Sequence, residues 1–379
     1  MSASANTHFI GSNNRIDFYE TAHGVIPSGD ANTATDDWIG FSTNLNRSIK
    51  AGRTFTNEIA TTFSLVYTSV IGYNGGVLAP NGDIHFVPSA ANRGQKVSAS
   101  GVVSTYSLAY TNGSGAYVGG VLAPNGDIHF VPNYAVVGQK VSASGVVSTY
   151  ALVHTNINGA YAGGVVAPNG DIHFVPNYAA VGQKISPAGV VSTYALVYTV
   201  EDAYSGGVLA PNGDIHFMPR GLASVGQKVS ASGVVSTYSL AYTVEDGFFG
   251  GVLSSTGEIH MVPFVSTVGQ KISTNGTVST YSILMTGGNK FSGGVLAPTG
   301  DIYFIPYAGF GQCMKISATN VVSTFTNDFI ASYYGGILRP DGTIVMLPAI
   351  TSYEGRILYT NSARPLDFGT CASPYLNKH

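Results

Sequence analysis

Charged residues are scarce in this chain of 379 residues. Lysine, arginine, aspartate and glutamate together make up 10% of the sequence, where roughly a quarter is usual, and the formal net charge is −3. So little charge leaves no basic surface of the kind that binds the phosphates of nucleic acid. Polarity comes instead from Ser, Thr, Asn, Gly and Tyr, a composition common in extracellular and virion β-proteins. We therefore expect no nucleic-acid partner.

Several other features are missing. Cys313 and Cys371 are the only cysteines, so the sequence has neither a disulfide framework nor the cysteine spacing of a metal site. No apolar stretch approaches the ~18 residues of a membrane span, and the first 15 residues have no charged and apolar regions of a signal peptide. Gly-x-Ser-x-Gly, His-Glu-x-x-His and phosphate-binding glycine motifs do not occur. These absences predict no membrane insertion, no cofactor, no metal and no enzymatic activity.

What the chain has in abundance is repetition. A unit of about 44 residues occurs seven times, and each copy opens on a Gly-Gly pair. The first glycines of these pairs are Gly75, Gly119, Gly163, Gly206, Gly250, Gly293 and Gly335. A period of roughly 40–50 residues is typical of β-propellers, in which each repeat forms one blade.

The second copy shows what one repeat encodes. The runs Gly120–Ala123 and Asp127–Val131 flank the dipeptide Asn125-Gly126, which is the strongest short signal of a β-hairpin. Gln139–Val141 and Val146–His154 flank a second turn in the same way. Each copy thus predicts four short strands and no helix. One such sheet exposes two apolar faces, which stacking of the copies around an axis would bury.

The strand count predicts that the ring closes. The fourth strand of the seventh copy is degraded, because Pro365 stands where a ladder donor is needed. An unmatched fourth strand precedes the first copy, since Thr62–Tyr67 matches Thr105–Tyr110. We expect a strand at 61–67 to complete the last blade, which closes an all-β, seven-bladed propeller over 59–379. The Gly-Gly strand would be innermost, where backbones crowd, and an open solenoid is the alternative.

Residues 1–58 do not repeat and contain the one tryptophan, Trp38. Their sequence is polar and rich in residues that favour turns. We expect either an arm that anchors the protein to a partner or a cap on one face of the propeller.

One histidine recurs in the strand after the Asn-Gly turn of five copies: His85, His129, His173, His216 and His260. A ring of histidines could hold a metal ion. However, Tyr303 and Val345 take this place in the last two copies, which favours a structural role. We expect each histidine to bond a serine or threonine of its own blade.

Opposite charges recur at two further positions. An acidic residue precedes each histidine by two places: Asp83, Asp127, Asp171, Asp214, Glu258 and, before Tyr303, Asp301. A basic residue recurs in the third strand: Lys96, Lys140, Lys184, Lys228, Lys271, Lys315 and, in the seventh copy, Arg356. The matching periods predict a girdle of ion pairs within or between blades. A basic channel for an anionic ligand is the alternative.

Tyrosine recurs in the fourth strand, at Tyr106, Tyr150, Tyr194, Tyr238 and Tyr281, with Phe63 and Phe325 at matching places. Exchange of tyrosine for phenylalanine indicates that the ring packs between blades and that the hydroxyl is dispensable.

Two loops vary between copies, one after the second strand and one before the Gly-Gly pair. Binding sites commonly lie on loops that a rigid scaffold displays. The candidates for ligand contact are Asn133, Tyr134, Asn177, Tyr178, Arg220, Glu201, Asp202, Glu245 and Asp246. The two acidic pairs among them could bind a cation, although solvated loop charges explain them as well.

The motif Gly-Gly-Val-Leu-Ala-Pro-Asn-Gly-Asp-Ile-His-Phe-Val-Pro at 119–132 resembles Kelch-like and WD-like propeller repeats of a type found in tailed-phage and other virion proteins. The resemblance covers about 60–360. The motif lacks the final Trp-Asp of WD repeats and the Tyr and Trp of Kelch repeats. This resemblance implies a structural or receptor-binding component of a phage tail, fibre or capsid surface.

Three functions follow as hypotheses. The first is a non-enzymatic virion component, outside the cell, whose propeller contacts a host-surface glycan or protein and whose residues 1–58 bind other virion or assembly proteins. The second is a lectin-like propeller with one sugar pocket per blade. The third is a propeller enzyme acting on polysaccharide, for which only the acids at 201–202 and 245–246 offer a catalytic cluster.

Overall fold

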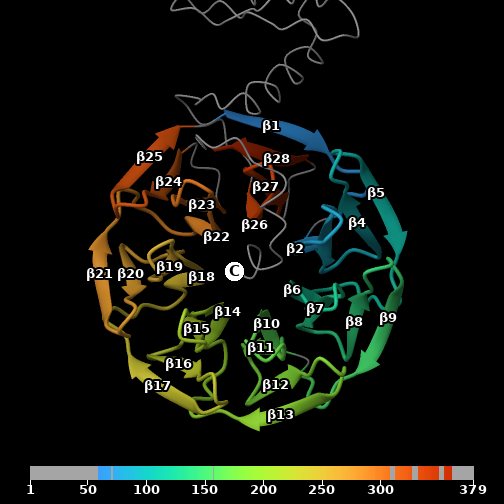
Figure 1. The fold of residues 1–379 in the computed structure, drawn as a ribbon, viewed down its shortest axis with the longest axis horizontal. Helices are drawn as coiled ribbons and strands as arrows, with labels where there is room; N and C mark the ends of the chain where they lie inside the picture. Colours follow the sequence, from blue (N-terminus) through green and yellow to red (C-terminus); the bar gives the residue numbers. More distant parts are fainter. Residues whose placement is uncertain are drawn as a thin grey trace, which may run out of the picture. The chain divides into compact units, whose positions relative to one another are not determined.

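A seven-bladed β-propeller forms the part of the chain that the computed structural model describes, which comprises residues 59–69, 71–156, 158–307, 312–326, 332–349 and 354–360. Within these ranges every regular element is a strand, and the strands form seven antiparallel sheets of four, arranged around an axis (Figure 1). In the same ranges there is no helix long and apolar enough to cross a membrane. The expectations for residues 1–58, Pro365 and Cys371 concern parts of the chain outside these ranges.

Each repeat forms one blade, with its strands in chain order from the axis outward. Blade 1 consists of β2 (Tyr73–Leu78), β3 (Ile84–Pro88), β4 (Arg93–Val97) and β5 (Val103–Ser107). Blade 2 consists of β6 (Tyr117–Leu122), β7 (Ile128–Pro132), β8 (Val137–Val141) and β9 (Val147–Ala151). Blade 3 consists of β10 (Tyr161–Val166), β11 (Ile172–Pro176), β12 (Val181–Ile185) and β13 (Val191–Ala195). Blade 4 consists of β14 (Tyr204–Leu209), β15 (Ile215–Pro219), β16 (Val225–Val229) and β17 (Val235–Ser239).

The remaining blades follow the same order, except that the last takes its outer strand from the start of the described chain. Blade 5 consists of β18 (Phe248–Leu253), β19 (Ile259–Pro263), β20 (Val268–Ile272) and β21 (Val278–Ser282). Blade 6 consists of β22 (Phe291–Leu296), β23 (Ile302–Pro306), β24 (Gln312–Ile316) and β25 (Val322–Thr326). Blade 7 consists of β26 (Tyr333–Leu338), β27 (Thr343–Pro348), β28 (Glu354–Tyr359) and β1 (Ile59–Ser64).

Pairing of β1 with β28 closes the ring, as the strand count predicts. The two strands run antiparallel, with Ile59 opposite Tyr359 and Ser64 opposite Glu354. The closing strand differs in its bounds from the predicted 61–67, because its last predicted residues turn toward blade 1. The backbone amides of Val66 and Tyr67 donate to Gln95 Oε1 in β4, at 3.0 and 2.8 Å. One segment therefore holds the outer edge of blade 7 and the flank of blade 1.

This glutamine contact recurs at five of the junctions between neighbouring blades. Five glutamines of the third strands are completely buried: Gln95, Gln139, Gln183, Gln227 and Gln270. Each accepts two hydrogen bonds from consecutive backbone amides that follow the outer strand of the preceding blade. In blade 6, Met314 takes this place opposite Thr324. The sequence analysis does not predict a role for the glutamines, although they directly precede the repeated lysine in five copies.

Glycine is required where the innermost strands meet. Gly163 has φ +90°, and a Cβ atom on it would lie 2.9 Å from the Cα atom of Gly206 in the next blade. Gly206 repeats the situation, with φ +78° and a Cβ position 3.0 Å from the Cα atom of Gly250. A side chain at either position would push neighbouring inner strands apart. The Gly-Gly strands are therefore innermost, as predicted (Figure 1).

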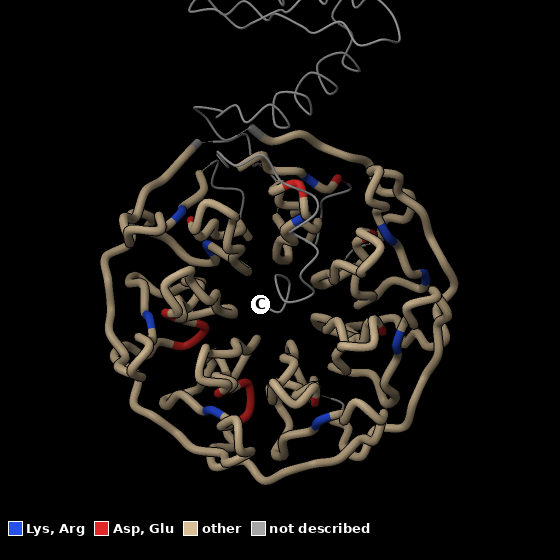
Figure 2. The backbone as a smooth tube through the Cα atoms, in the orientation of Figure 1, with Lys and Arg blue, Asp and Glu red and all other residues tan. Residues whose placement is uncertain are grey.

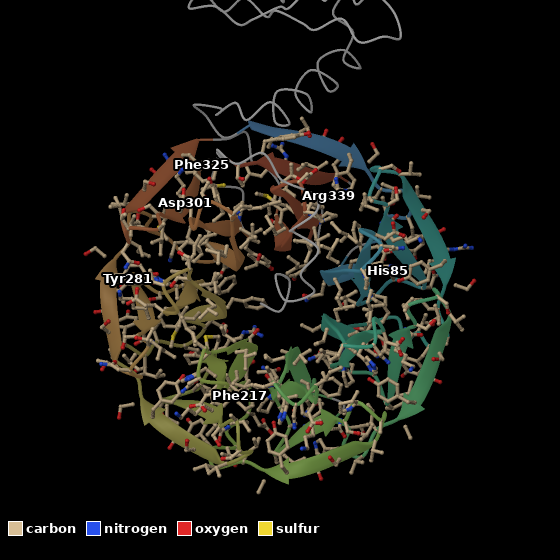
Figure 3. All side chains as sticks on the ribbon, viewed as in Figure 1. His85, Phe217, Tyr281, Asp301, Phe325 and Arg339 are labelled. Atoms are coloured by element: carbon tan, nitrogen blue, oxygen red, sulfur yellow. The ribbon has the colours of Figure 1, made fainter. Side chains whose placement is uncertain are left out.

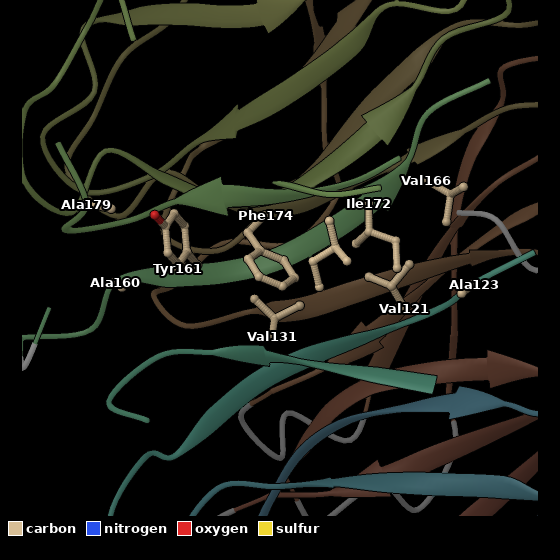
Figure 4. Packing of buried hydrophobic residues seen from close by; sticks show 10 residues of the cluster. Val121, Ala123, Val131, Ala160, Tyr161, Val166, Ile172, Phe174 and Ala179 are labelled. Atoms are coloured by element: carbon tan, nitrogen blue, oxygen red, sulfur yellow. The ribbon is translucent and has the colours of Figure 1, made fainter. Parts of the chain in front are cut away.

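The hydrophobic core lies between the blades. Val121 and Val131 of blade 2 pack against Tyr161, Ile172 and Phe174 of blade 3, and all five are buried (Figure 4). Strands of alternating apolar residues place one such layer on each side of a blade. The burial of apolar surface, worth about 25 cal/mol per Å², is thus obtained by stacking and not within a single repeat.

The repeated histidines pair with tyrosine, not with the serine or threonine predicted. His85 Nδ1 lies 3.2 Å from the Tyr106 hydroxyl, across β4 in the same blade. The tyrosine ring crosses Gly94, where a Cβ atom would be 2.1 Å from the ring. Equivalent pairs join His129 to Tyr150, His173 to Tyr194 and His260 to Tyr281 at 3.2–3.3 Å, and His216 and Tyr238 have ring centroids 5.3 Å apart. Tyrosine is the partner because Gly94 has no side chain. The Tyr106 ring fills the space above this glycine and so reaches His85.

The tyrosine rings also pack between blades, as predicted, since Tyr106 contacts a core cluster shared by blades 1 and 2. Figure 3 shows Tyr281 on the outer side of its blade. In blade 6 both members of the pair change, and Tyr303 meets Phe325 edge-on with centroids 5.8 Å apart. Burial, followed by the charge of Lys96, lowers the pKa of His85 to about 4, so the ring is neutral at pH 7. Among the described residues no group of three or more His, Cys, Asp or Glu is placed to hold a metal ion.

The acidic and basic sets form ion pairs within blades 1 to 6. Figure 2 marks where the charged residues lie along the backbone. The distances are 2.7 Å for Lys96–Asp83, Lys140–Asp127, Lys184–Asp171 and Lys271–Glu258, 2.6 Å for Lys228–Asp214 and 3.8 Å for Lys315–Asp301. Burial raises the pKa of Asp83, but the hydrogen bond and charge of Lys96 and the Ala99 amide outweigh burial and leave the pKa below its ordinary value.

Arg356 does not belong to the lysine set, contrary to the sequence alignment. It lies opposite Met346, as Gln139 lies opposite Phe130, while Ile357 occupies the lysine position. The assignment from sequence was therefore wrong by one residue, because the segment between β27 and β28 is one residue longer than its counterparts in blades 1, 2, 3 and 5.

Candidate functional site at one end of the axis

The strand directions define two faces of the propeller. The turns between first and second strands and between third and fourth strands lie on one face, which we call the turn face. The innermost strands begin, and the second strands end, on the other face, which we call the pocket face. In blade 2, Tyr117 of β6 is opposite Pro132 of β7, so Val118 and Asn133 come close together there.

A pocket of about 300 Å³ opens at the axis on the pocket face. Two positions of the repeat supply most of its lining. Asn74, Val118, Ala162, Ser205, Phe249 and Tyr334 directly precede the Gly-Gly pairs. Asn133, Asn177, Arg220, Phe264 and Tyr307 directly follow the proline that ends each second strand, and Tyr134, Asn158, Tyr178 and Asp202 belong to adjoining loops.

These two positions differ from copy to copy, whereas the residues around them repeat. Before the Gly-Gly pair the seven copies have Asn, Val, Ala, Ser, Phe, Ser and Tyr, and after the proline they have Ser, Asn, Asn, Arg, Phe, Tyr and Ala. The result is one asymmetric pocket with a polar half and an aromatic half.

Arg220 organises the polar half. Its Nε donates to Asp246 Oδ1 at 3.2 Å, and its Nη1 lies 3.7 Å from Asp202 Oδ1. The guanidinium carbon also stands 5.1 Å from the centroid of the Phe249 ring. Two carboxylates and one aromatic face thus hold the guanidinium in a single orientation.

Four rings form the aromatic half in a continuous chain. Phe249 and Phe264 have centroids 5.8 Å apart, Phe264 and Tyr307 meet edge-on at 5.3 Å, and Tyr307 and Tyr334 are 5.5 Å apart. The hydroxyls of Tyr307 and Tyr334 are 3.5 Å apart. Burial, with the hydrogen bond to Tyr307, raises the pKa of Tyr334, so the Tyr334 hydroxyl is neutral at pH 7.

Asn133 and Asn177 hold neighbouring blades together as well as lining the pocket. Asn133 Nδ2 donates to the backbone carbonyl of Tyr161 at 2.8 Å. Asn177 Nδ2 donates to the carbonyl of Tyr204 at 3.1 Å and to Asp202 Oδ1 at 2.8 Å. These amide groups therefore serve the contact between blades, while Tyr134, 43% exposed, offers its ring to a ligand.

The structure brings most of the predicted contact residues to this pocket. Asn133, Tyr134, Asn177, Tyr178, Asp202 and Arg220 line it. Asp246 does not line the pocket but pairs with Arg220, which does. Glu201 and Glu245 are exposed and lie outside the lining. Figure 2 shows these acidic turns before β14 and β18 in neighbouring blades.

The aromatic residues Phe249, Phe264, Tyr307 and Tyr334 were missed as candidates. An alignment of the seven copies at the position before Gly-Gly and at the position after the proline would have found them.

Comparison with known proteins shows the fold. No family model and no curated protein matches the sequence. Among solved structures, a streptogramin B lyase is similar with a TM-score of 0.69 and 19% identity over 81% of this chain and 99% of that one. A catalytically inactive virginiamycin B lyase from Staphylococcus aureus with quinupristin has a TM-score of 0.69 and 17% identity over 80% of this chain and 100% of that one. The extracellular domain of a hybrid two-component system from B. thetaiotaomicron has a TM-score of 0.62 and 9% identity over 82% of this chain and 43% of that one.

These comparisons correct the prediction of a non-enzymatic protein. The lyases have the same propeller fold, so neither the scaffold nor the missing catalytic motifs exclude an enzyme. That part of the sequence-based prediction was wrong, because it took the absence of known catalytic motifs as evidence against an enzyme. At 17–19% identity the likeness shows the fold alone.

Proposed function

We propose that this propeller is a recognition module that binds its ligand in the axial pocket. One observation carries the proposal: the positions at which the copies differ most are those that line a single pocket. Repeat positions that serve the scaffold have stayed alike in most copies: the Gly-Gly pair in all seven, and the glutamine and the histidine in five each. Loops on a rigid scaffold are where recognition residues are commonly found.

Attachment to a virion and contact with a host surface remain the biological setting that we propose. The low charge and the repeat motif at 119–132 support it, and residues 1–58 would bind the partner. Deletion of 1–58 is expected to abolish incorporation into the assembly and to leave ligand binding unchanged. Normal incorporation without this segment would contradict the anchoring role.

The binding proposal is tested with the full-length protein on a broad panel of glycans, peptides and host cells. We expect saturable binding that Tyr307→Ala weakens at least tenfold. Tyr242→Ala is the matched control, because it removes a half-buried tyrosine of the same face, which packs against a core cluster and lies outside the pocket. Equal binding by both variants and the unchanged protein would refute the proposal. Bound compounds should also be analysed by mass after incubation, so that turnover is detected if it occurs.

A further inference from the structure

The charges around the pocket disfavour a charged ligand. Arg220 contributes one positive charge, and Asp202 and Asp246 contribute two negative charges within 3.7 Å of it. Among the described lining residues Arg220 is the one cationic group, and exposed Glu201 and Glu245 lie on the same turns. An anion would meet this acidic surplus, whereas a cation would meet Arg220, which already covers the face of Phe249.

The hydrogen-bonding groups suit hydroxyls. A carboxylate can accept hydrogen bonds only, and a guanidinium can donate only. Here both kinds stand 3.2–3.7 Å apart on one rigid cluster. A hydroxyl group both donates and accepts, so two adjacent hydroxyls can satisfy both kinds of group at once. The amide of Asn158 adds a further polar group to the lining.

The aromatic wall supplies a surface for an apolar ring face. Phe264, Tyr307 and Tyr334 form it on the side opposite the polar blades 2–4. Aromatic rings contribute large contact areas at little cost in side-chain entropy. The volume of about 300 Å³ is at the lower end of the roughly 300–1,000 Å³ of small-molecule sites, which fits a single ring better than a chain.

We propose that the pocket binds one uncharged sugar residue of a glycan, with Arg220 and Asp202 on adjacent hydroxyls, Asp246 holding Arg220 in place, and the Phe264–Tyr307–Tyr334 wall against the ring face. This inference rests on the proposed function. It predicts one site per chain, in contrast to a lectin-like propeller with one pocket in every blade.

The test uses the full chain on an array of neutral, acidic and amino sugars, followed by calorimetry on the best compound. We expect a neutral glycan to bind with one site per chain and at least tenfold more weakly to Arg220→Met and to Tyr307→Ala. Tyr307→Phe keeps the ring and should bind within about threefold of the unchanged protein. Thermal unfolding of each variant shows that it is folded, and Tyr242→Ala is the control.

Each outcome decides the inference. Absence of binding to any neutral glycan, seven equivalent sites, or neutral binding that survives both Arg220→Met and Tyr307→Ala would overturn it. If acidic sugars, amines or peptides bind instead and these two variants weaken them, the sugar inference fails while the proposed function stands. If no bound compound responds to either variant, the proposed function fails as well.

Discussion

The two faces of the propeller are built from the same seven copies, yet they have diverged unequally. On the turn face Ala-Pro-Asn-Gly-Asp recurs in four copies, and its aspartate joins two turns. Asp127, for example, accepts Lys140 Nζ at 2.7 Å and the Ala143 amide at 3.2 Å. On the pocket face the residues nearest the axis change from blade to blade. Duplication alone would leave both faces alike, so the difference indicates that the pocket face was free to diverge while the turn face kept the blades in shape.

Acid should destabilise both faces together, because the repeated histidines are buried in the second strands of five blades. Their pKa values are about 4 in the folded protein, below the ordinary 6.5. The unfolded state then binds more protons between pH 6.5 and 4, so stability is complete above about pH 6.5 and is lost as pH falls toward 4. We expect the free energy of unfolding to fall by about 2–3 kcal/mol per histidine by pH 4.5. Summed over the five histidines, this loss exceeds the effect of any substitution described below. Unfolding temperatures across this range measure it.

A copy exchange checks the cause of this acid sensitivity. His173→Tyr combined with Tyr194→Phe reproduces the Tyr303–Phe325 pair of blade 6. The double variant should fold at pH 7 and lose less stability on acidification than the unchanged protein. An identical pH profile would show that the histidines do not cause the loss.

The next largest effect is expected beneath the pocket face. Gln183→Met removes the acceptor for the amides of Val153 and His154, which lie 3.0 and 2.8 Å from Oε1. Two backbone donors would then be left unsatisfied at a buried joint, at a cost of about 2–4 kcal/mol. Met314→Leu, at the same position of blade 6, is the control and should be nearly neutral. Urea unfolding measures the stability of both variants. Equal unfolding midpoints would mean that the hydrogen bonds of Gln183 do not stabilise the joint between the blades.

A pair of carboxylate changes compares the faces directly. Asp127→Ala on the turn face removes the partner of Lys140 and of a turn amide, and should destabilise by about 1–3 kcal/mol. Asp246→Asn on the pocket face, where the side chain is 39% exposed, should cost less than about 1 kcal/mol. A larger loss of stability for Asp246→Asn than for Asp127→Ala in chemical unfolding would contradict this comparison. It would mean that the pocket face contributes more to the stability of the fold than the turn face.

The smallest effect on stability is expected at the rim of the pocket. Tyr134 is 43% exposed, so Tyr134→Ala should change the free energy of unfolding by no more than about 0.5 kcal/mol. Binding of the ligand should nevertheless weaken, since the ring borders the pocket. A large loss of stability would indicate that Tyr134 serves the fold.

The fold was predictable in detail because each repeat carries its own local signals. The Asn-Gly turns, strand-ending prolines and seven Gly-Gly pairs predicted the blades, and Thr62–Tyr67 predicted the closure. Side-chain partners were less predictable. The tyrosine partner of each histidine depends on a glycine in the strand between them, and the Arg356 register depends on a loop length.

The candidate site was predictable in part. Variation between copies pointed to the loops that carry Tyr178 and Arg220, which do line the pocket. It could not show that Asp202 and Asp246 both turn to Arg220, because they precede different blades. It also did not distinguish the four aromatic residues that complete the wall.

By itself the sequence determined the number of blades, the strands within them and the innermost place of the Gly-Gly pairs, since these follow from local turn chemistry and from a count. Only the tertiary structure decided which variable residues meet. A ring brings together the corresponding ends of strands that lie about 44 residues apart in the chain, and at its axis single residues from successive blades become neighbours. The pocket is therefore a property of the closed ring and of no single repeat.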